Sequence, residues 1–312
     1  MTITVLSAAA RPFVEAHLPA WVEPRWYANA EELMKVAPEA EIGWFDGVGL
    51  DAMLEAPMRA ANLKWLNTFM AGIESWPLAV MRDRGVVFTN GTGVNDIAVA
   101  EYALLGMLVV AKGYRDVVRA QDRHEWLNDA PGKIELHGTK ALIVGAGAIG
   151  KRIGAMLAPF QVEVTEVRRT PAPGALGPDE WRARLGEFDW IIITVPATAE
   201  TENMFSAAEF DAMKPGAAIL NFSRGTVIDQ DALMVAARSG QVGGAFLDVT
   251  EPEPLPADHP LWTCDNVHIS QHLSGRSQRA VFRRGAERFL QNLELWKRGE
   301  PLLGTVDYDL GY

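Results

Sequence analysis

Cysteine is almost missing from this chain of 312 residues, which contains only Cys264. One cysteine cannot form an intrachain disulfide, and it cannot build a cysteine-based metal site. We interpret Cys264 as a small apolar residue of the core, and we expect no metal centre in this protein.

Long apolar runs are also missing. The longest one covers residues 97–111, is interrupted by Glu101, and falls short of the roughly 20 residues that a membrane span requires. The opening segment, MTITVLSAAARP, lacks the basic start and the long apolar core of a secretory signal. We therefore expect a cytoplasmic protein that does not bind membranes.

Positive charge is in deficit, because 29 Lys and Arg residues against 40 Asp and Glu residues give a formal net charge of −11. Phosphate backbones and anionic membranes repel such a protein, so we do not expect a nucleic acid as a partner. An anionic substrate must then be bound by a local group of basic side chains.

The sequence does contain a regular alternation of short apolar segments and helical patterns. Apolar strands separated by helices indicate parallel sheets that are covered on both faces. The predicted strands form two series, residues 3–6, 41–45, 63–69 and 86–90, and then residues 140–145, 162–167, 190–195, 217–222, 244–249 and 267–270. A long helical stretch from Val94 to about Trp126 separates the two series, and a last helix covers about 275–299.

These patterns predict an α/β protein with two Rossmann-like, doubly wound parallel-sheet domains and the active site in the cleft between them. We assign residues 94–275 to a dinucleotide-binding domain. Residues 1–93 and 276–312 would form the substrate domain, which is flavodoxin-like and discontinuous because the last helix returns to it.

The segment GAGAIG follows a predicted strand directly and opens a predicted helix. In the dinucleotide fingerprint the first glycine permits a tight turn, the second lets the backbone approach the pyrophosphate, and the third allows close packing of helix and strand. The N–H groups that begin the helix would then face the phosphates. We predict that a dinucleotide binds at Gly145, Gly147, Ala148, Ile149 and Gly150.

The end of the next predicted strand bears on the choice between NAD and NADP. Arg168, Arg169 and Thr170 stand where NAD-binding proteins carry an acidic residue for the ribose 2′-hydroxyl. Two guanidinium groups and a hydroxyl suit a 2′-phosphate by charge and by geometry. Glu166 is a rival that would favour NAD if it reached the ribose. We expect the cofactor to be NADPH in preference to NADH.

Three later strands end in side chains with complementary chemistry. Arg224 follows one strand, Asp248, Glu251 and Glu253 end or follow the next, and His272 follows the third. Ligands of open parallel sheets bind beyond the carboxyl ends of the strands, so we expect these side chains to meet there. Reduction of a 2-keto acid requires a guanidinium for the substrate carboxylate, a histidine that protonates the carbonyl oxygen, and a carboxylate that supports the histidine.

With these residues the chain resembles the D-isomer-specific 2-hydroxyacid dehydrogenase family, nearest its glyoxylate/hydroxypyruvate reductase-like branch. The matching segments follow the order of the family over most of residues 63–275. They include GTGVNDIAVAEYALLGML, LIVGAGAIGKRIGAMLAPF, MKPGAAILNFSRGTVIDQDAL, GGAFLDVTEPEPLPADHPLW and NVHISQHLSG. The resemblance implies an NADPH-linked reductase of small 2-keto acids, such as glyoxylate or hydroxypyruvate, that forms a homodimer.

The resemblance also implies a role for particular residues. Arg224 would bind the substrate, His272 would be the acid/base, and Glu253, which is followed by Pro-Leu-Pro, would support His272. The loop FMAGIE resembles the family's substrate loop, so backbone N–H groups would bind the substrate carboxylate at Met70, Ala71 and Gly72. Further cofactor contacts would come from Val195, Pro196, Phe222, Ser223, Ser274 and Asp248, the last of which would face the nicotinamide carboxamide.

Two departures from the family leave alternatives open. Gln271 stands where the family usually has proline before the catalytic histidine, and a residue other than proline frees φ and restores an N–H donor, so we expect His272 to be held differently. FMAGIE differs from the common GAGVD, so the substrate could be a bulkier aryl 2-keto acid. A dinucleotide-sensing, corepressor-like interaction protein is a further alternative. His268 lies inside its strand, and we interpret it as a packed side chain.

Overall fold

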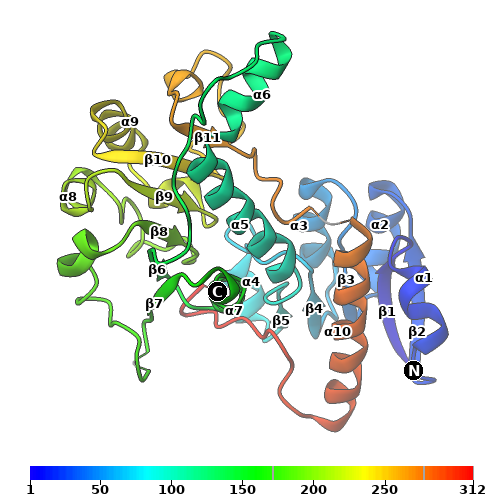
Figure 1. Ribbon diagram of the computed structural model, residues 1–312. Coiled ribbons are helices and arrows are strands. Elements are labelled where there is room, and N and C mark those ends of the chain that lie inside the picture. Colours follow the sequence, from blue (N-terminus) through cyan, green and yellow to red (C-terminus); the bar gives the residue numbers. More distant parts are fainter. Residues whose placement is uncertain (171, 277, 312) are drawn as a thin grey trace. The chain divides into compact units, whose positions relative to one another are not determined.

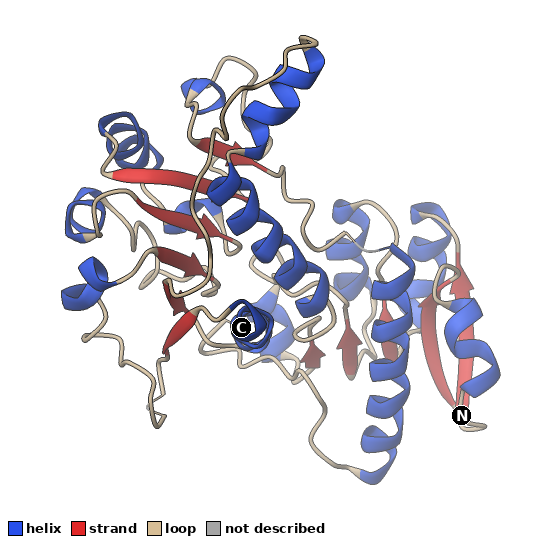
Figure 2. Cartoon of the chain, in the orientation of Figure 1, coloured by secondary structure: helices blue, strands red, loops and turns tan. Residues whose placement is uncertain are grey.

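The computed structural model describes residues 1–170, 172–276 and 278–311, and at 278 and 279 the backbone only. The chain divides into two compact units, Met1–Asn95 with Arg276–Tyr312, and Asp96–Gly275. Each unit contains one sheet whose strands are all parallel, and helices pack against each sheet (Figure 2). The predicted fold class, two parallel-sheet α/β domains, is therefore confirmed.

The first unit has a five-stranded sheet with the order β2-β1-β3-β4-β5, which is the strand order of flavodoxin-like folds (Figure 1). Its strands are β1 (Thr2–Ser7), β2 (Val22–Tyr27), β3 (Ile42–Trp44), β4 (Trp65–Asn67) and β5 (Val87–Thr89). Its helices are α1 (Arg11–Val14), α2 (Ala30–Val36), α3 (Leu50–Arg59), α4 (Leu78–Asp83) and α10 (Gln278–Arg298), with the 3-10 turns η1 (Glu15–His17) and η2 (Ala37–Glu39).

Strand β2 is the one strand of this sheet that the sequence pattern did not predict. Its sequence, VEPRWY, contains Pro24 and two charged residues, so it lacks the apolar run of a buried strand. β2 lies at the edge of the sheet and pairs only with β1. A proline is tolerated in an edge strand because its missing N–H faces no neighbouring strand.

Alternate residues of each strand contribute to cores on opposite faces of the sheet. In β4, Trp65 packs on Phe289 of α10 with ring centroids 5.2 Å apart, whereas Leu66 belongs to the core cluster of the other face. Phe289 also packs on Trp44 of β3 at 5.1 Å. The last helix of the chain thus completes the core of the unit that contains the first strand.

The second unit has a six-stranded sheet with the order β11-β10-β9-β8-β6-β7. Its strands are β6 (Lys140–Val144), β7 (Glu163–Val167), β8 (Trp190–Ile193), β9 (Ala217–Asn221), β10 (Val242–Leu247) and β11 (Val267–Ile269). Its helices are α5 (Asp96–Lys112), α6 (Tyr114–Asp122), α7 (Ala148–Leu157), α8 (Ala207–Ala212) and α9 (Gln230–Ser239), with the 3-10 turns η3 (Ala158–Phe160), η4 (Arg182–Glu187), η5 (Gly225–Val227) and η6 (Pro260–Thr263).

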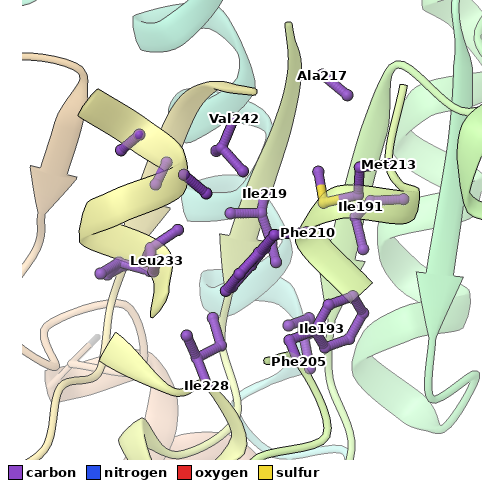
Figure 3. Packing of buried hydrophobic residues seen from close by; sticks show 14 of the residues in the cluster. Ile191, Ile193, Phe205, Phe210, Met213, Ala217, Ile219, Ile228, Leu233 and Val242 are labelled. Carbon is purple, nitrogen blue, oxygen red and sulfur yellow. The ribbon is translucent and has the colours of Figure 1, made fainter. Parts of the chain in front are cut away.

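The same alternation builds two cores around the second sheet. In β8, Ile191 and Ile193 face a cluster that includes Phe210 of α8 (Figure 3). Ile192, between them, belongs to the opposite cluster, to which α5 and α7 contribute. Because both faces are covered, the inner strands β8 (WIII) and β10 (VGGAFL) carry no charged residue, as the sequence pattern indicated. The edge strand β7 (EVTEV), in contrast, carries two glutamates.

The predicted helical stretch from Val94 to Trp126 is interrupted. α5 and α6 are separate helices bent by 72° at Gly113, where φ is +58°. A Cβ at Gly132 would lie only 2.3 Å from Gly113 N, so the chain after α6 passes directly over this bend. In the described chain no single helix has the length and hydropathy of a membrane span, and α5 with α6 reaches them only as a bent pair.

Candidate functional site

The glycine-rich turn between β6 and α7 has the backbone geometry of a dinucleotide-binding loop. Gly145 has a φ of +101°, which glycine adopts readily, and a Cβ there would lie 2.8 Å from the backbone of Thr194. A Cβ at Gly150 would lie 2.5 Å from Gly145 O, so helix and strand pack closely. A Cβ at Gly147 would meet nothing within 4 Å, which leaves room for a ligand beside the backbone.

The turn also stands at the reversal point of the sheet. β6 lies between β7 and β8, and ligands of open parallel sheets bind at such a reversal, beyond the carboxyl ends of the strands. The first N–H groups of α7, at Ala148, Ile149 and Gly150, have no acceptor within the helix and carry the positive end of its dipole. These residues therefore fit the pyrophosphate of a dinucleotide.

Charged side chains gather at the end of β7. Arg168 donates from Nη2 to Ala146 O at 3.3 Å, and its Nε lies 3.6 Å from Glu166 Oε2. Both charged residues, together with Lys151 of α7, line an open hollow of about 390 Å³. Glu166 is thus ion-paired with Arg168, and Lys151 adds a cation that sequence reasoning missed because it lies 17 residues away on a helix.

The other residues predicted on the adenosine side follow β7 and β8. Arg169 Nη2 lies 3.7 Å from Glu200 Oε1, and Thr170 is exposed. Val195 is half-buried and Pro196 is exposed. All of them stand beyond the carboxyl ends of their strands, where a ligand of a parallel sheet binds.

The turn after β9 is built around the buried side chain of Asn221. Its Oδ1 accepts from Ser223 N at 2.9 Å, and its Nδ2 donates to Arg224 O at 2.9 Å. Arg224 is half-buried and donates from Nη1 to Ser223 O at 2.7 Å. Ser223 Oγ is buried and has no hydrogen-bond partner in the described part of the chain, which suits a group that binds a ligand. The ring of Phe222 instead packs on Phe246, at 6.0 Å.

Gly225 connects this turn to the loop after β10. A Cβ at Gly225 would lie 2.1 Å from the backbone carbonyl of Thr250, so a residue with a side chain could not be accommodated. Thr250 N donates to Glu253 Oε1 at 3.1 Å and thereby orients that carboxylate. The loops that carry Arg224 and Glu253 are therefore in direct backbone contact.

The second oxygen of Glu253 contacts the predicted acid/base. Glu253 Oε2 lies 2.7 Å from His272 Nδ1, and the contact is an ion pair when the ring is protonated. The side chain of His272 is 47% exposed, and its Nε2 has no partner among the described residues. The imidazole is thus held on one side by a carboxylate and is accessible to a ligand on the other.

The loop that carries His272 has an uncommon backbone. Gln271 and His272 have φ values of +56° and +54°, in the left-handed region that residues other than glycine seldom adopt. A proline fixes φ at about −65° and cannot take this conformation. Gln271, the residue that departs from the family pattern, is therefore compatible with the loop as it is, whereas the family's usual proline is not.

Asp248 is buried at the end of β10 and holds this loop with its carboxylate. Its Oδ1 accepts from Ser270 Oγ at 2.7 Å, and from the N–H groups of Leu273 at 3.1 Å and Ser274 at 3.2 Å. Its Oδ2 accepts from Ser274 Oγ, and its backbone carbonyl accepts from His272 N at 2.5 Å. In the structure, Asp248 and Ser274 thus bind each other, an anchoring role that the sequence did not reveal.

The predicted substrate loop follows β4 in the first unit. Met70 N donates to Thr68 Oγ1 at 3.1 Å, so this N–H group is already engaged. The N–H groups of Ala71 and Gly72 have no acceptor among the residues that the structure describes. Of the three predicted donors, these two are available to an anion.

His268, in β11, has a different environment from His272. Burial, followed by the charge of the neighbouring Arg115, lowers the pKa of His268 to about 4. The ring is therefore neutral near pH 7 and packs as an ordinary side chain. Within the described ranges, no group of three or more His, Cys, Asp and Glu side chains could hold a metal ion.

Comparisons with known proteins identify the family of this chain. A family model described as "D-isomer specific 2-hydroxyacid dehydrogenase, NAD binding domain" matches residues 104–274. A human protein, glyoxylate reductase/hydroxypyruvate reductase, is 31% identical over 255 residues, which cover 78% of this chain and 76% of the human one. The matched residues lie within the unit Asp96–Gly275, which contains the glycine-rich turn, Arg224, Glu253 and His272.

Two crystal structures are similar over nearly the whole chain. A D-isomer specific 2-hydroxyacid dehydrogenase family protein from Aeromonas salmonicida has a TM-score of 0.84 at 29% identity, with 99% of each chain covered. A D-isomer specific 2-hydroxyacid dehydrogenase from Xanthobacter autotrophicus, in complex with NADPH and MES, has a TM-score of 0.80 at 25% identity, with 100% of this chain and 99% of that chain covered. The chain therefore belongs to the D-isomer-specific 2-hydroxyacid dehydrogenase family, and it is an oxidoreductase of the 2-hydroxyacid dehydrogenase and 2-keto acid reductase type.

Proposed function

We propose that the protein reduces small 2-keto acids, such as glyoxylate or hydroxypyruvate, to 2-hydroxy acids with NADPH. The observation that carries the proposal is the 2.7 Å contact between His272 Nδ1 and Glu253 Oε2, on loops that leave the same sheet as Arg224 and the glycine-rich turn. The human relative, whose name includes both glyoxylate and hydroxypyruvate, supports this substrate class.

His272 is the proton donor in this proposal. When the imidazolium donates from Nδ1 to Glu253, its remaining N–H, at Nε2, is left for the substrate oxygen. The negative charge of Glu253 stabilises the protonated ring, and the ring then gives its Nε2 proton to the carbonyl oxygen as that oxygen becomes a hydroxyl. In the reverse direction the neutral ring accepts the hydroxyl proton at the same nitrogen.

Arg224 binds the substrate carboxylate and the carbonyl oxygen, because its guanidinium remains charged and offers several donors in one plane. A bound nicotinamide dinucleotide supplies the hydride for C2. In the first unit, the N–H groups of Ala71 and Gly72 provide further contacts for the substrate carboxylate. We assign Met70 no direct contact, because its N–H donates to Thr68.

The preference for NADPH rests on the end of β7. Arg168 and Lys151 line the same hollow, and Arg169 and Thr170 follow the strand, so basic groups and a hydroxyl lie where a 2′-phosphate would bind. Arg169 also pairs with Glu200. The similar Xanthobacter structure contains NADPH. Glu166 opposes this preference because it pairs with Arg168.

The substitution Arg168→Asp tests the cofactor proposal. We expect the ratio of kcat/KM for NADPH to kcat/KM for NADH to fall at least about tenfold, because a charge-assisted contact is replaced by repulsion. Arg238→Asp, on the exposed side of α9, changes the net charge equally and serves as the control. An unchanged ratio in Arg168→Asp would show that this guanidinium does not contact the phosphate.

We also propose that the protein is a homodimer. Several apolar side chains on and after α5 and α6 are exposed in the described chain, namely Leu105, Tyr114, Val118, Trp126, Leu127 and Ile134. Trp126 is 93% exposed. Apolar surface gathered on neighbouring segments is typical of a protein contact, and a second copy of this chain is the partner that we propose for it.

A panel of 2-keto acids from glyoxylate to phenylpyruvate, assayed with NADPH and with NADH, tests the substrate class. Small substrates should give the highest kcat/KM. A maximum at phenylpyruvate would support the bulkier aryl substrates instead. Tight binding of NADPH without turnover of any keto acid would contradict the reductase and would favour a dinucleotide-sensing interaction protein.

A further inference from the structure

Asp46 is a buried acid that has no part in the reaction proposed above. It lies two residues after the end of β3, and the residue is inaccessible to solvent, with 0% exposed. β3 pairs in parallel with β4, and the predicted substrate loop follows β4. Residues that leave two adjacent parallel strands emerge at the same edge of the sheet, so Asp46 stands beside the start of that loop.

Three hydrogen-bond donors surround the carboxylate of Asp46. Its Oδ2 accepts from Trp44 Nε1 at 2.6 Å and from Phe69 N at 2.7 Å. Its Oδ1 accepts from Thr68 Oγ1 at 2.7 Å. Burial raises the pKa of Asp46 to about 6, so the group is mostly ionised at pH 7, and the ionised carboxylate accepts hydrogen bonds without donating any. Two of its three donors belong to the residues that open the loop.

Thr68 transmits this contact to the loop. Its side chain is buried, its hydroxyl proton is donated to Asp46, and its oxygen accepts from Met70 N at 3.1 Å. Because the ionised carboxylate has no proton to give, it fixes the direction in which the hydroxyl points. The oxygen lone pair of Thr68 is therefore presented to Met70.

Donors in the segment after β5 form hydrogen bonds with two carbonyl groups of the loop. Gly91 N donates to Met70 O at 2.6 Å, and Asn90 Nδ2 donates to Ala71 O at 3.1 Å. Met70 is thus fixed at both its N–H and its carbonyl. Among the described residues, this leaves the N–H groups of Ala71 and Gly72 without an acceptor and in a fixed orientation.

We propose that Asp46 is a positioning residue, which through Thr68 and Phe69 sets the direction of the two backbone N–H groups that bind the substrate carboxylate. The inference rests on the proposed function, because it takes the ligand of Ala71 and Gly72 to be a 2-keto acid. Asp46 acts through the hydroxyl of Thr68 and the backbone of Phe69 and does not touch the substrate, since its carboxylate is buried and engaged by three donors.

Three substitutions test the proposal. Asp46→Asn keeps the size of the side chain but turns one acceptor into a donor, so the hydroxyl of Thr68 loses its acceptor. Thr68→Val removes the hydroxyl and keeps the shape, while Thr68→Ser keeps the hydroxyl. We expect the KM for glyoxylate to rise about tenfold in Asp46→Asn and in Thr68→Val, and to stay near the wild-type value in Thr68→Ser. The KM for NADPH should not change.

A second readout does not depend on turnover. Hydrogen exchange of the backbone amides of residues 69–72, measured on the full chain without substrate, should be faster in Asp46→Asn and Thr68→Val. Asn292→Ala is the control, because Asn292 is also fully buried in the first unit but bonds Leu303, at 2.8 and 3.0 Å. This control should lower the melting temperature without changing the KM for glyoxylate.

The outcomes separate the two proposals. If wild-type protein reduces keto acids but Asp46→Asn alters neither the KM for glyoxylate nor the loop exchange, Asp46 is not a positioning residue. The same conclusion follows if Asn292→Ala raises the KM as much, since the effect is then a general loosening. If the wild type reduces no keto acid, the proposed function fails, and the exchange rates of residues 69–72 alone decide the role of Asp46.

Discussion

At the scale of single residues, the contact that one ring nitrogen of His272 makes decides which nitrogen is left to exchange a proton with the substrate. The contact of Nδ1 with Glu253 leaves Nε2 as the nitrogen that can reach a substrate. Thr250 N holds the other oxygen of Glu253, so the carboxylate cannot rotate freely away from the ring. A supporting carboxylate and an accessible imidazole are therefore provided by two neighbouring loops of one sheet.

We predict different losses when the two partners are removed. His272→Ala should lower kcat for keto acid reduction by about 10²–10⁴, the usual contribution of a general acid. Glu253→Gln should cost less, roughly tenfold, because the amide can still orient the ring but does not stabilise its charge. His268→Leu should leave kcat unchanged in the same steady-state assay. Equal kcat values for wild type and His272→Ala would exclude this histidine as the proton donor.

Gln271 permits a second prediction at this scale. Its φ of +56° is favourable for glycine and inaccessible to proline. Gln271→Gly should therefore keep kcat within about twofold, whereas Gln271→Pro should displace the loop of His272 and lower kcat at least about tenfold. NADPH binding, measured by fluorescence titration, should be similar in both variants. A fully active Gln271→Pro would show that the loop tolerates the family's usual geometry.

At the scale of elements, the apolar segments of the sequence located ten of the eleven strands. β2 was not predicted, because an edge strand tolerates Pro24 and charged neighbours and therefore does not need an apolar run. The break between α5 and α6 was not predicted for a different reason. Gly113 is compatible with a helix in sequence, and only its contact with Gly132 of the returning chain shows that the helix must end there.

β11 supplies a prediction about pH and stability. The pKa of His268 is about 4 in the folded protein, below the value near 6.5 of an exposed histidine, so between these values the unfolded chain binds more protons. The stability that the neutral ring contributes is complete above pH 6.5 and is lost as the pH falls toward 4. Urea unfolding should show a decrease on the order of 1–2 kcal/mol between pH 7.5 and 5 from this residue.

His268→Leu checks that assignment. The leucine variant should lose less stability than the wild type over the same acid range, because it carries no group that gains a proton on unfolding. If both proteins lose stability in parallel between pH 7.5 and 5, another group is responsible for the acid sensitivity.

At the scale of the whole molecule, the sequence indicated which loops carry the candidate site better than it indicated the hydrogen bonds that hold these loops in place. Arg224, Glu253 and His272 could be named because each follows a predicted strand, and parallel strands bring such residues to one edge. Asp46 and Asp248 could not be given their anchoring roles, since their donors come from other segments of the chain. Hydrogen bonds between segments distant in sequence leave no periodic pattern.

The exposed apolar side chains after α5 lead to a prediction about assembly. Trp126→Glu should shift the sedimentation coefficient of the protein from that of a dimer toward that of a monomer, because a charge replaces an indole that is 93% exposed in the single chain. Val235→Glu, at a site on α9 that is 68% exposed, should leave the dimer intact. A wild-type protein that sediments as a monomer would contradict the proposed assembly.

We propose that this chain transfers hydride from NADPH to small 2-keto acids. The most direct measurement is the oxidation of NADPH by the purified wild-type protein with glyoxylate, followed by absorbance, with the 2-hydroxy acid product quantified in the same samples. We predict one molecule of glycolate for each NADPH oxidised and a slower reaction with NADH. Absence of NADPH oxidation with glyoxylate, hydroxypyruvate and phenylpyruvate alike, by protein that binds NADPH, would show that the protein is not a 2-keto acid reductase of this type.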